Sequence, residues 1–117
     1  MVTLKTLPIS TRQEVFNQIA NHLLSQRKSS TNRDWCAYRG SGGLKCAAGC
    51  LISDQEYCEK MEGNSWDLLV SKEMVPEAHQ DLIVKLQRVH DFQSVRNWKR
   101  CIQKAAMELG LEWEPTA

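Results

Sequence analysis

The stretch 36-CAYRGSGGLKCAAGCLISDQEYC-58 holds four of the five cysteines of the chain around a Gly-Ser-Gly-Gly core. It interrupts a sequence whose other long segments show helical periodicity, so it decides what kind of helical protein this is. Residues 35–39 have strand character, the glycine core is typical of a turn, and residues 44–52 suit a short apolar helix or a second strand. A second backbone segment is expected to pack closely against the small residues Ala47, Ala48 and Gly49.

A long helix is predicted before this stretch, over residues 10–26. Ser10 or Thr11 is its candidate N-cap, with Gln13 or Glu14 three residues later as the reciprocal partner. Apolar residues recur on one stripe at helical spacing, namely Val15, Phe16, Ile19, Ala20, Leu23 and Leu24. Residues 1–9 before the helix are expected to be extended or loose.

Shorter signals follow the cysteine segment. Ser53 with Glu56 is a candidate capping box, Gly63 ends that turn, and Ser65 opens a brief helix. Pro76 fits the first turn of the next helix, because its missing N–H would be unpaired there. That helix has an apolar side made of Leu82, Ile83, Leu86 and Val89.

The last helix is predicted to begin after Ser94 and to end at Gly110, which suits a left-handed C-terminal position. Its inner stripe consists of Trp98, Cys101, Ile102, Ala105 and Leu109. His90 and Asp91 precede it. They are not expected to act as an acid–base pair, because neighbouring residues in a helix point in different directions.

The fold class predicted from these patterns is mainly α, a small helical domain with a short Gly-rich hairpin or loop insertion. A chain of 117 residues suits a single globular domain, 1–117. No apolar run approaches the roughly 20 residues that span a bilayer, and the N-terminus lacks the apolar core of a secretory signal. The expectation is a cytoplasmic protein without membrane contact, whose thiols are reduced.

Charge is unevenly placed along the chain, although the formal net charge is only +1. Residues 27–45, the basic loop or hairpin region, hold five bases and one acid, and residues 53–67 hold five acids and one base. Residues 85–104 hold six bases and one acid. The small total excludes a bulk attraction to nucleic acid or membrane, but it allows separate basic and acidic faces.

The cysteine segment admits four interpretations. The first is structural zinc held by Cys36, Cys46, Cys50 and Cys58, although zinc sites usually use two close pairs of ligands and only Cys46 and Cys50 form one. The second is a thiol enzyme centred on Cys46, whose pKa a helix N-terminus would lower. No metal or cofactor is expected under the favoured interpretations, with zinc as the alternative.

The third interpretation is an anion-binding loop. Arg39 and Lys45 would supply the charges, and Gly42 and Gly43 would supply flexible backbone N–H groups before a helix start. The spacing differs from that of a P-loop, which ends in Gly-Lys-Ser/Thr. The fourth interpretation is purely structural: the glycines permit positive φ angles in a turn, and the sulfurs fill a tight core.

The segment CAYRGSGGLKCAAG, together with the later MEG, LQRVHD and LGL, resembles a group of small uncharacterised phage and prophage proteins. They share a Cys-x-Tyr-Arg-Gly…Gly-Leu-Lys-Cys-Ala-x-Gly motif, and the resemblance runs from Phe16 to about Leu111. It labels a family without indicating a chemistry. It implies a mobile-element setting, in which small proteins often act by binding host components.

Two further surfaces are candidates for binding. Arg96, Arg100 and Lys104 are spaced by four residues, so they are expected to line one helix face and to contact phosphates, or else to be a solvated face. The acidic residues Glu56, Glu59 and Glu62 are a second candidate, for a basic partner.

The leading expectation is a binding protein, not an enzyme, whose partner is a host protein or complex, as in inhibition of a defence system. Its charges Arg39 and Lys45 are expected to point outward. The alternatives are a binder of a small anionic ligand or nucleic acid through Arg39, Lys45 and the basic last helix, and a zinc- or thiol-dependent enzyme centred on Cys46. The sequence does not determine the oligomeric state.

Overall fold

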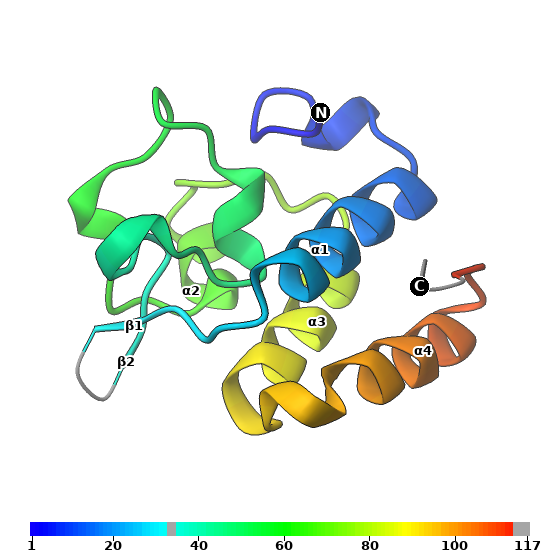
Figure 1. Ribbon diagram of the computed structural model, residues 1–117. Coiled ribbons are helices and arrows are strands. Elements are labelled where there is room, and N and C mark those ends of the chain that lie inside the picture. Colours follow the sequence, from blue (N-terminus) through cyan, green and yellow to red (C-terminus); the bar gives the residue numbers. More distant parts are fainter. Residues whose placement is uncertain (33–34, 114–117) are drawn as a thin grey trace.

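The computed structural model describes residues 1–32 and 35–113. It confirms a mainly helical fold. The α-helices within these ranges are α1 (Arg12–Gln26), α2 (Trp66–Ser71), α3 (Gln80–Phe92) and α4 (Trp98–Leu109) (Figure 1). Short 3-10 helices lie at Leu7–Ile9, Ser41–Gly43, Ala48–Leu51, Glu59–Met61 and Val95–Asn97. In the part of the chain described, no helix combines the length and the apolar character needed to cross a membrane.

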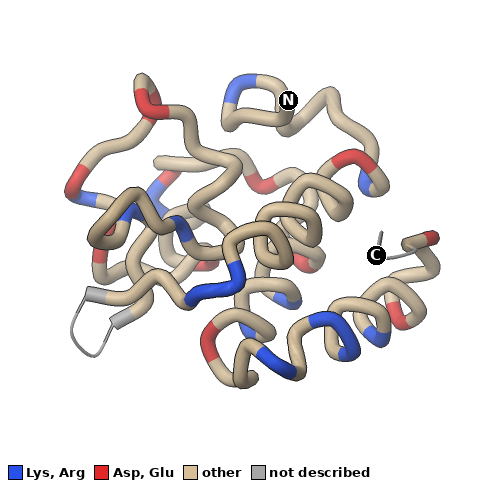
Figure 2. The backbone as a smooth tube through the Cα atoms, in the orientation of Figure 1, with Lys and Arg blue, Asp and Glu red and all other residues tan. Residues whose placement is uncertain are grey.

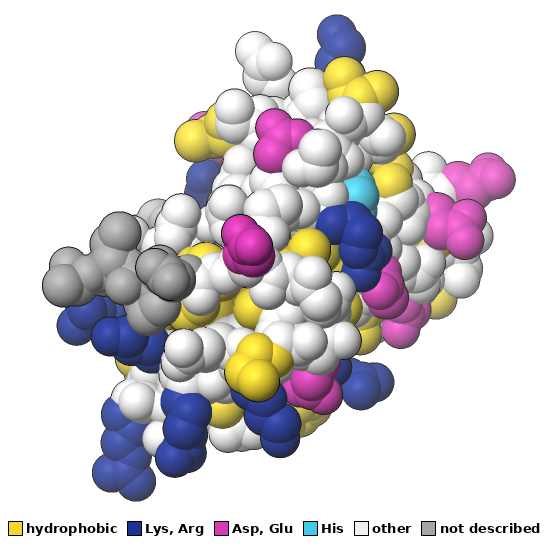
Figure 3. Space-filling model, turned by 90° about the vertical axis from the view of Figure 1, so that its right-hand side faces the viewer, with side chains coloured by type: hydrophobic (Ala, Val, Ile, Leu, Met, Phe, Trp, Pro, Cys, Tyr) yellow, Lys and Arg dark blue, Asp and Glu magenta, His cyan; other side chains and the backbone are white. Residues whose placement is uncertain are grey.

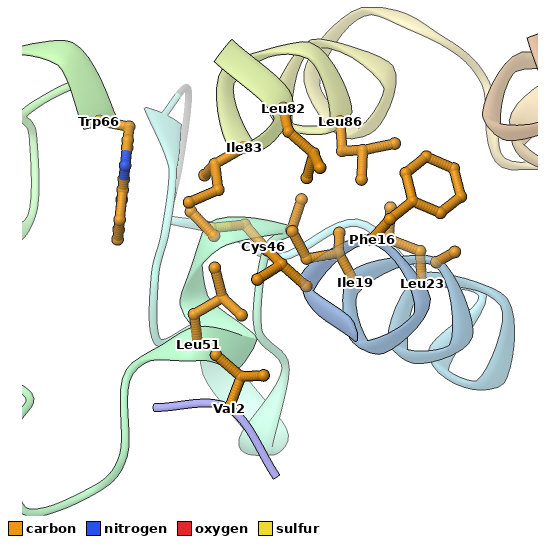
Figure 4. Packing of buried hydrophobic residues seen from close by; sticks show 14 of the residues in the cluster. Val2, Phe16, Ile19, Leu23, Cys46, Leu51, Trp66, Leu82, Ile83 and Leu86 are labelled. Atoms are coloured by element: carbon orange, nitrogen blue, oxygen red, sulfur yellow. The ribbon is translucent and has the colours of Figure 1, made fainter. Parts of the chain in front are cut away.

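The helices α1, α3 and α4 pack against one another and form the core of the molecule. Phe16, Ile19 and Leu23 of α1 face the aliphatic side chains of α3 (Figure 4). The 3-10 helix Ala48–Leu51 packs on both α1 and α3, and Leu51 is completely buried. The predicted apolar stripes therefore meet in one cluster.

The start of α1 confirms the predicted capping box. Thr11 Oγ1 accepts a 3.1 Å hydrogen bond from the Glu14 N–H, and the Glu14 carboxylate accepts a 2.8 Å bond from the Thr11 N–H. The same reciprocal pattern joins Ser53 and Glu56. Ser65 caps α2 by accepting from the Leu68 N–H at 3.2 Å.

Two predicted helix starts are wrong. Pro76 lies outside α3, which begins only at Gln80 after His79 takes a left-handed conformation with φ 61°. Ser94 precedes the separate 3-10 turn Val95–Asn97, so α4 begins at Trp98. The predicted end of α4 is confirmed, since Gly110 has φ 69° and donates to the carbonyls of the last turn.

The strands β1 (Thr31–Asn32) and β2 (Trp35–Cys36) form a small antiparallel hairpin, with Thr31 opposite Cys36. The hairpin lies before the glycine core, and β2 is shorter than the strand predicted over residues 35–39. The glycine core forms a 3-10 turn in which Gly42 and Gly43 have φ 70° and 79°. Arg33 of the predicted basic region lies outside the described residues.

Gly49 confirms the predicted close approach of a second backbone segment. A Cβ atom at this position would lie 2.5 Å from the carbonyl oxygen of Tyr38 and 3.2 Å from its Cα. Real Cβ atoms do not approach backbone atoms this closely, so only glycine lets the two segments pack in this way.

The N-terminal segment, expected to be extended or loose, is docked on the core, although Met1 and Ile9 at its two ends are exposed. Val2, Leu4 and Leu7 are buried in the core. Gln18 of α1 exchanges hydrogen bonds with the backbone of Val2, at 2.7 and 2.8 Å. The apolar side chains explain the difference, because each removes surface from water when the segment docks.

Candidate functional site

Arg39 lies against the backbone of the cysteine segment. Its guanidinium donates to the carbonyls of Gly49 at 3.0 Å and Ile52 at 2.5 Å, and it forms a 3.2 Å salt bridge with Asp54. It also lies 5.0 Å from the ring centroid of Tyr57, and only 17% of the side chain is exposed. The expectation of an outward-facing charge at Arg39 is therefore wrong.

Glu62 holds the opposite side of the same corner. Its carboxylate accepts hydrogen bonds from the N–H groups of Tyr38 at 2.9 Å and Arg39 at 3.1 Å. It also accepts from the Tyr57 hydroxyl at 2.7 Å. Burial, followed by the bond to Glu62, raises the pKa of Tyr57 to about 12, so this hydroxyl stays a donor.

The predicted acidic surface of Glu56, Glu59 and Glu62 is not one surface with three available charges. Glu56 accepts from the N–H groups of Leu4, Lys5 and Ser53, and Glu62 closes the corner around Arg39. Glu59 alone of the three is exposed, and its carboxylate has no hydrogen-bond partner among the described residues. The carboxylates of Glu56 and Glu62 are therefore used for contacts within the protein.

Lys45 and the two glycines lie elsewhere on the loop. The Lys45 carbonyl accepts from His22 Nε2 at 2.9 Å and from Gln26 Nε2 at 2.8 Å, which fixes this backbone to α1. A Cβ at Gly42 or Gly43 would meet open space. Arg39, by contrast, is bound to residues 49–54. The loop therefore does not bring the predicted residues Arg39, Gly42, Gly43 and Lys45 together at one ligand site.

The cysteines are dispersed among different environments. Cys46 is fully buried in the core, Cys50 donates its thiol to the Ala47 carbonyl at 3.1 Å, and Cys58 is exposed. Cys36 instead belongs to the one described group of three possible metal ligands, together with His90 and Asp91. The four-cysteine zinc site is thus not assembled. A nucleophile at Cys46 would have no access to a substrate.

His90 is the centre of a buried polar network between the hairpin and α3. Its Nε2 accepts a 2.9 Å bond from the Ser30 N–H, so the ring proton lies on Nδ1, which contacts the Asp91 carboxylate at 2.8 Å. Gln87 binds the same carboxylate oxygen and the Cys36 sulfur, at 2.8 and 2.9 Å. The side chains of His90 and Asp91 therefore contact each other, contrary to the expectation that neighbours in a helix point apart.

This network leaves His90 without a free nitrogen lone pair. A base that activates a thiol needs such a lone pair, and so does a histidine that ligates zinc. The hydrogen bond with Cys46, followed by burial, also raises the pKa of Cys36, which disfavours the thiolate. As it stands, the group Cys36, His90 and Asp91 is arranged for structure and not for metal binding or nucleophilic attack.

A basic groove lies between α1 and α4 and has a volume of about 1380 Å³. Arg27, Arg96 and Lys99 line it, with Glu112 as the only carboxylate among the described lining residues. Four side-chain amides line it as well: Gln13, Asn17, Asn21 and Gln103. Figure 2 shows Lys and Arg positions at the end of α1 and along the start of α4.

The chain after α4 closes one end of this groove. The Gln13 side chain exchanges hydrogen bonds with the backbone of Glu112, one of them at 3.0 Å. Trp113 packs edge-to-face against Phe16 at 6.3 Å. The groove therefore has a fixed wall at this end and two helices along its sides.

The predicted row of Arg96, Arg100 and Lys104 is divided between two faces. Arg96 belongs to the turn before α4 and lines the basic groove, whereas Lys104 lines a second groove between α4 and α3. Lys and Arg side chains crowd the lower edge of the face in Figure 3. None of the three forms a salt bridge with a carboxylate within residues 1–32 and 35–113.

The contribution of α1 to the groove was not predicted from the sequence. The polar positions Gln13, Asn17 and Asn21 recur every four residues along one edge of the apolar stripe, which was the available signal. Comparisons with protein-family models, curated proteins and solved structures gave no match to this chain.

Proposed function

We propose that the protein is a binding protein whose basic groove takes the phosphate backbone of a nucleic acid. The observation that supports this most directly is the set of three cations and four amides on one concave surface. Cations neutralise phosphates, and amide side chains donate hydrogen bonds to phosphate oxygens or to base edges.

The start of α4 adds to the attraction for an anion. Trp98 and Lys99, the first two residues of this 12-residue helix, line the groove. The positive end of a helix dipole favours negative charge near the first turn. The opposing contributions are Glu112 and the C-terminus of α1 near Arg27, so the cations remain the main source of affinity.

The other anion-binding proposal, a site at Arg39 and Lys45, has less support. The Arg39 guanidinium already binds two carbonyls and Asp54, and a ligand would have to replace these contacts. Breaking charged hydrogen bonds costs about 1.5–3 kcal/mol each. The groove residues Arg96 and Lys99, by contrast, have no hydrogen-bond partner among described side chains.

The test is fluorescence anisotropy with a labelled 20-nucleotide DNA strand and a 20-base-pair duplex, at several salt concentrations. We expect affinity to fall with salt, since bound phosphates release counterions. Arg96→Glu with Lys99→Glu should weaken binding at least tenfold and flatten the salt slope by about two. Lys5→Glu with Lys60→Glu gives the same change in net charge away from the groove, and it should leave binding nearly unchanged.

The alternative partner is a host protein that presents an acidic surface to the groove. Polyglutamate serves as its probe in the same assay. Binding to polyglutamate but not to either DNA, with the same loss in the Arg96 and Lys99 variant, would replace nucleic acid by an acidic protein. If the Lys5 and Lys60 variant weakened binding to the same extent, the groove would not be the binding site.

A further inference from the structure

We propose a second binding site, independent of the basic groove, for an organic ammonium group. The site is the pocket of about 660 Å³ between the hairpin, the start of α2 and the end of α3. The lining residues that matter are Tyr38, Trp66, Asp67, Arg88, Asp91 and Phe92. This size is typical of small-molecule pockets, which combine apolar walls with a few fixed polar groups.

The charged residues of the pocket favour a cation. Asp67 and Asp91 line it against the single described cation Arg88, which is exposed. Each carboxylate is held through its Oδ1 atom: Gln80 binds that of Asp67 at 2.6 Å, and Gln87 and His90 bind that of Asp91 at 2.8 Å. The Oδ2 atoms have no hydrogen-bond partner among the described residues.

The aromatic walls add a second attraction for the same kind of group. The Tyr38 and Trp66 rings lie 6.4 Å apart at an angle of 58°, and Phe92 is 78% exposed at the rim. In Figure 4 the Trp66 ring lies apart from the aliphatic side chains of α1 and α3. Aromatic faces attract ammonium groups, and the attraction is strongest when water is excluded.

Trp66, in the wall of the pocket, carries an unpaired donor. Its indole N–H is buried and has no hydrogen-bond partner in the part of the chain that the structure describes. Buried donors of this kind are rare, because leaving one unpaired costs about 1–3 kcal/mol.

The hydrogen bonds also decide between an organic cation and a metal ion. Cys36, His90 and Asp91 have ligand atoms within 4.8 Å of one another. Binding of a metal at His90 Nδ1 would move the proton to Nε2, which faces the Ser30 N–H. Two donors would then oppose each other, whereas an ammonium group can bind Asp91 Oδ2 without disturbing the network.

The experiment is an NMR titration of the whole protein with n-butylammonium chloride, read at the Trp66 indole N–H and at the backbone of Asp91. The neutral probe n-butanol has the same apolar chain and lacks the charge. A Trp66→Phe variant assigns the indole signal. We expect saturable shifts with the ammonium only, and at least a fivefold weaker Kd in Asp91→Asn.

A matched control is Glu59→Gln, which removes one exposed carboxylate outside the pocket and should leave the Kd unchanged. Phe92→Ala is a second pocket variant at an exposed position, should Asp91→Asn fail to fold, and it should weaken binding as well. Equal shifts with n-butanol, no saturation, or a Kd unaffected by either pocket variant would overturn the proposal. Stoichiometric Zn²⁺ binding at the same signals would replace it with a metal site.

Discussion

The backbone N–H of Arg39 donates a 3.1 Å hydrogen bond to Glu62, while the Arg39 guanidinium binds the carbonyls of Gly49 and Ile52. One residue thus joins two parts of the irregular segment through two different groups. Tyr57 completes the arrangement, since it binds Glu62 and lies under the guanidinium. The conformation of this segment therefore depends on hydrogen bonds from side chains, because the segment has no long helix or strand to hold it.

Replacing Arg39 with alanine should lower the free energy of unfolding by roughly 2–4 kcal/mol, because two carbonyls lose a charged donor. Lysine should recover little of this loss, since an ammonium cannot reproduce the guanidinium fork. Urea denaturation measures both. Arg100→Ala is the control: Arg100 is exposed and makes only a 3.4 Å contact with Asn97, so its effect should stay within about 0.5 kcal/mol. Equal effects of the two alanine variants would contradict the role of Arg39.

Gly49→Ala should be more destabilising than Gly42→Ala. The new Cβ at Gly49 meets the Tyr38 backbone at 2.5 Å, and moving that segment costs about 1–3 kcal/mol or more. At Gly42 the added atom meets open space, and the cost of about 1 kcal/mol comes from the φ of 70°. Thermal unfolding of both variants checks the order. The reverse order would show that the segments at Gly49 separate easily.

Local features of this fold could be predicted from the sequence, because their causes lie within a few residues. The capping boxes at Thr11 and Ser53, the cap at Ser65 and the left-handed Gly110 all depend on neighbours in the chain. The close packing at Gly49 was also indicated, since a run of small residues leaves room for another backbone segment.

Contacts between distant residues could not be predicted in the same way. Ser30 and His90 are 60 residues apart, and the carbonyls that bind Arg39 lie 10 and 13 residues beyond it. Charge and spacing alone favoured an outward Arg39, because the acceptors become visible only when the segment is folded. The basic groove was partly predicted: Arg96 belongs to the predicted basic row and lines the groove, whereas the opposite wall comes from α1 and was not predicted.

The docking of the N-terminal segment should weaken in acid. Burial raises the pKa of Glu56, but hydrogen bonds from Ser53, Leu4 and Lys5 outweigh burial and hold it below the ordinary value of 4.5. This stabilisation is present above about pH 4.5 and is lost as the pH falls through the lowered pKa. The free energy of unfolding of the wild type should exceed that of Glu56→Gln by about 1 kcal/mol at pH 7, and this difference should shrink toward pH 3.

Urea denaturation at several pH values measures this difference. Glu59→Gln serves as the control, because Glu59 is exposed and its carboxylate accepts no hydrogen bond from a described residue. Its difference from wild type should stay small across the same range. If the difference in free energy of unfolding between wild type and Glu56→Gln did not change with pH, the Glu56 carboxylate would not be what holds the N-terminal segment.

The thiols should differ sharply in their reactivity. Cys58 is exposed, whereas Cys46 is fully buried, burial raises the pKa of Cys50 to about 12, and the Cys36 pKa is also raised. Alkylation requires an accessible thiolate. Iodoacetamide at pH 8 should therefore label Cys58 first in the folded protein, as intact and peptide mass spectrometry can show. Cys58→Ser should remove the fast label and Cys46→Ala should keep it, whereas fast labelling at Cys36 or Cys46 would restore the case for a thiol enzyme.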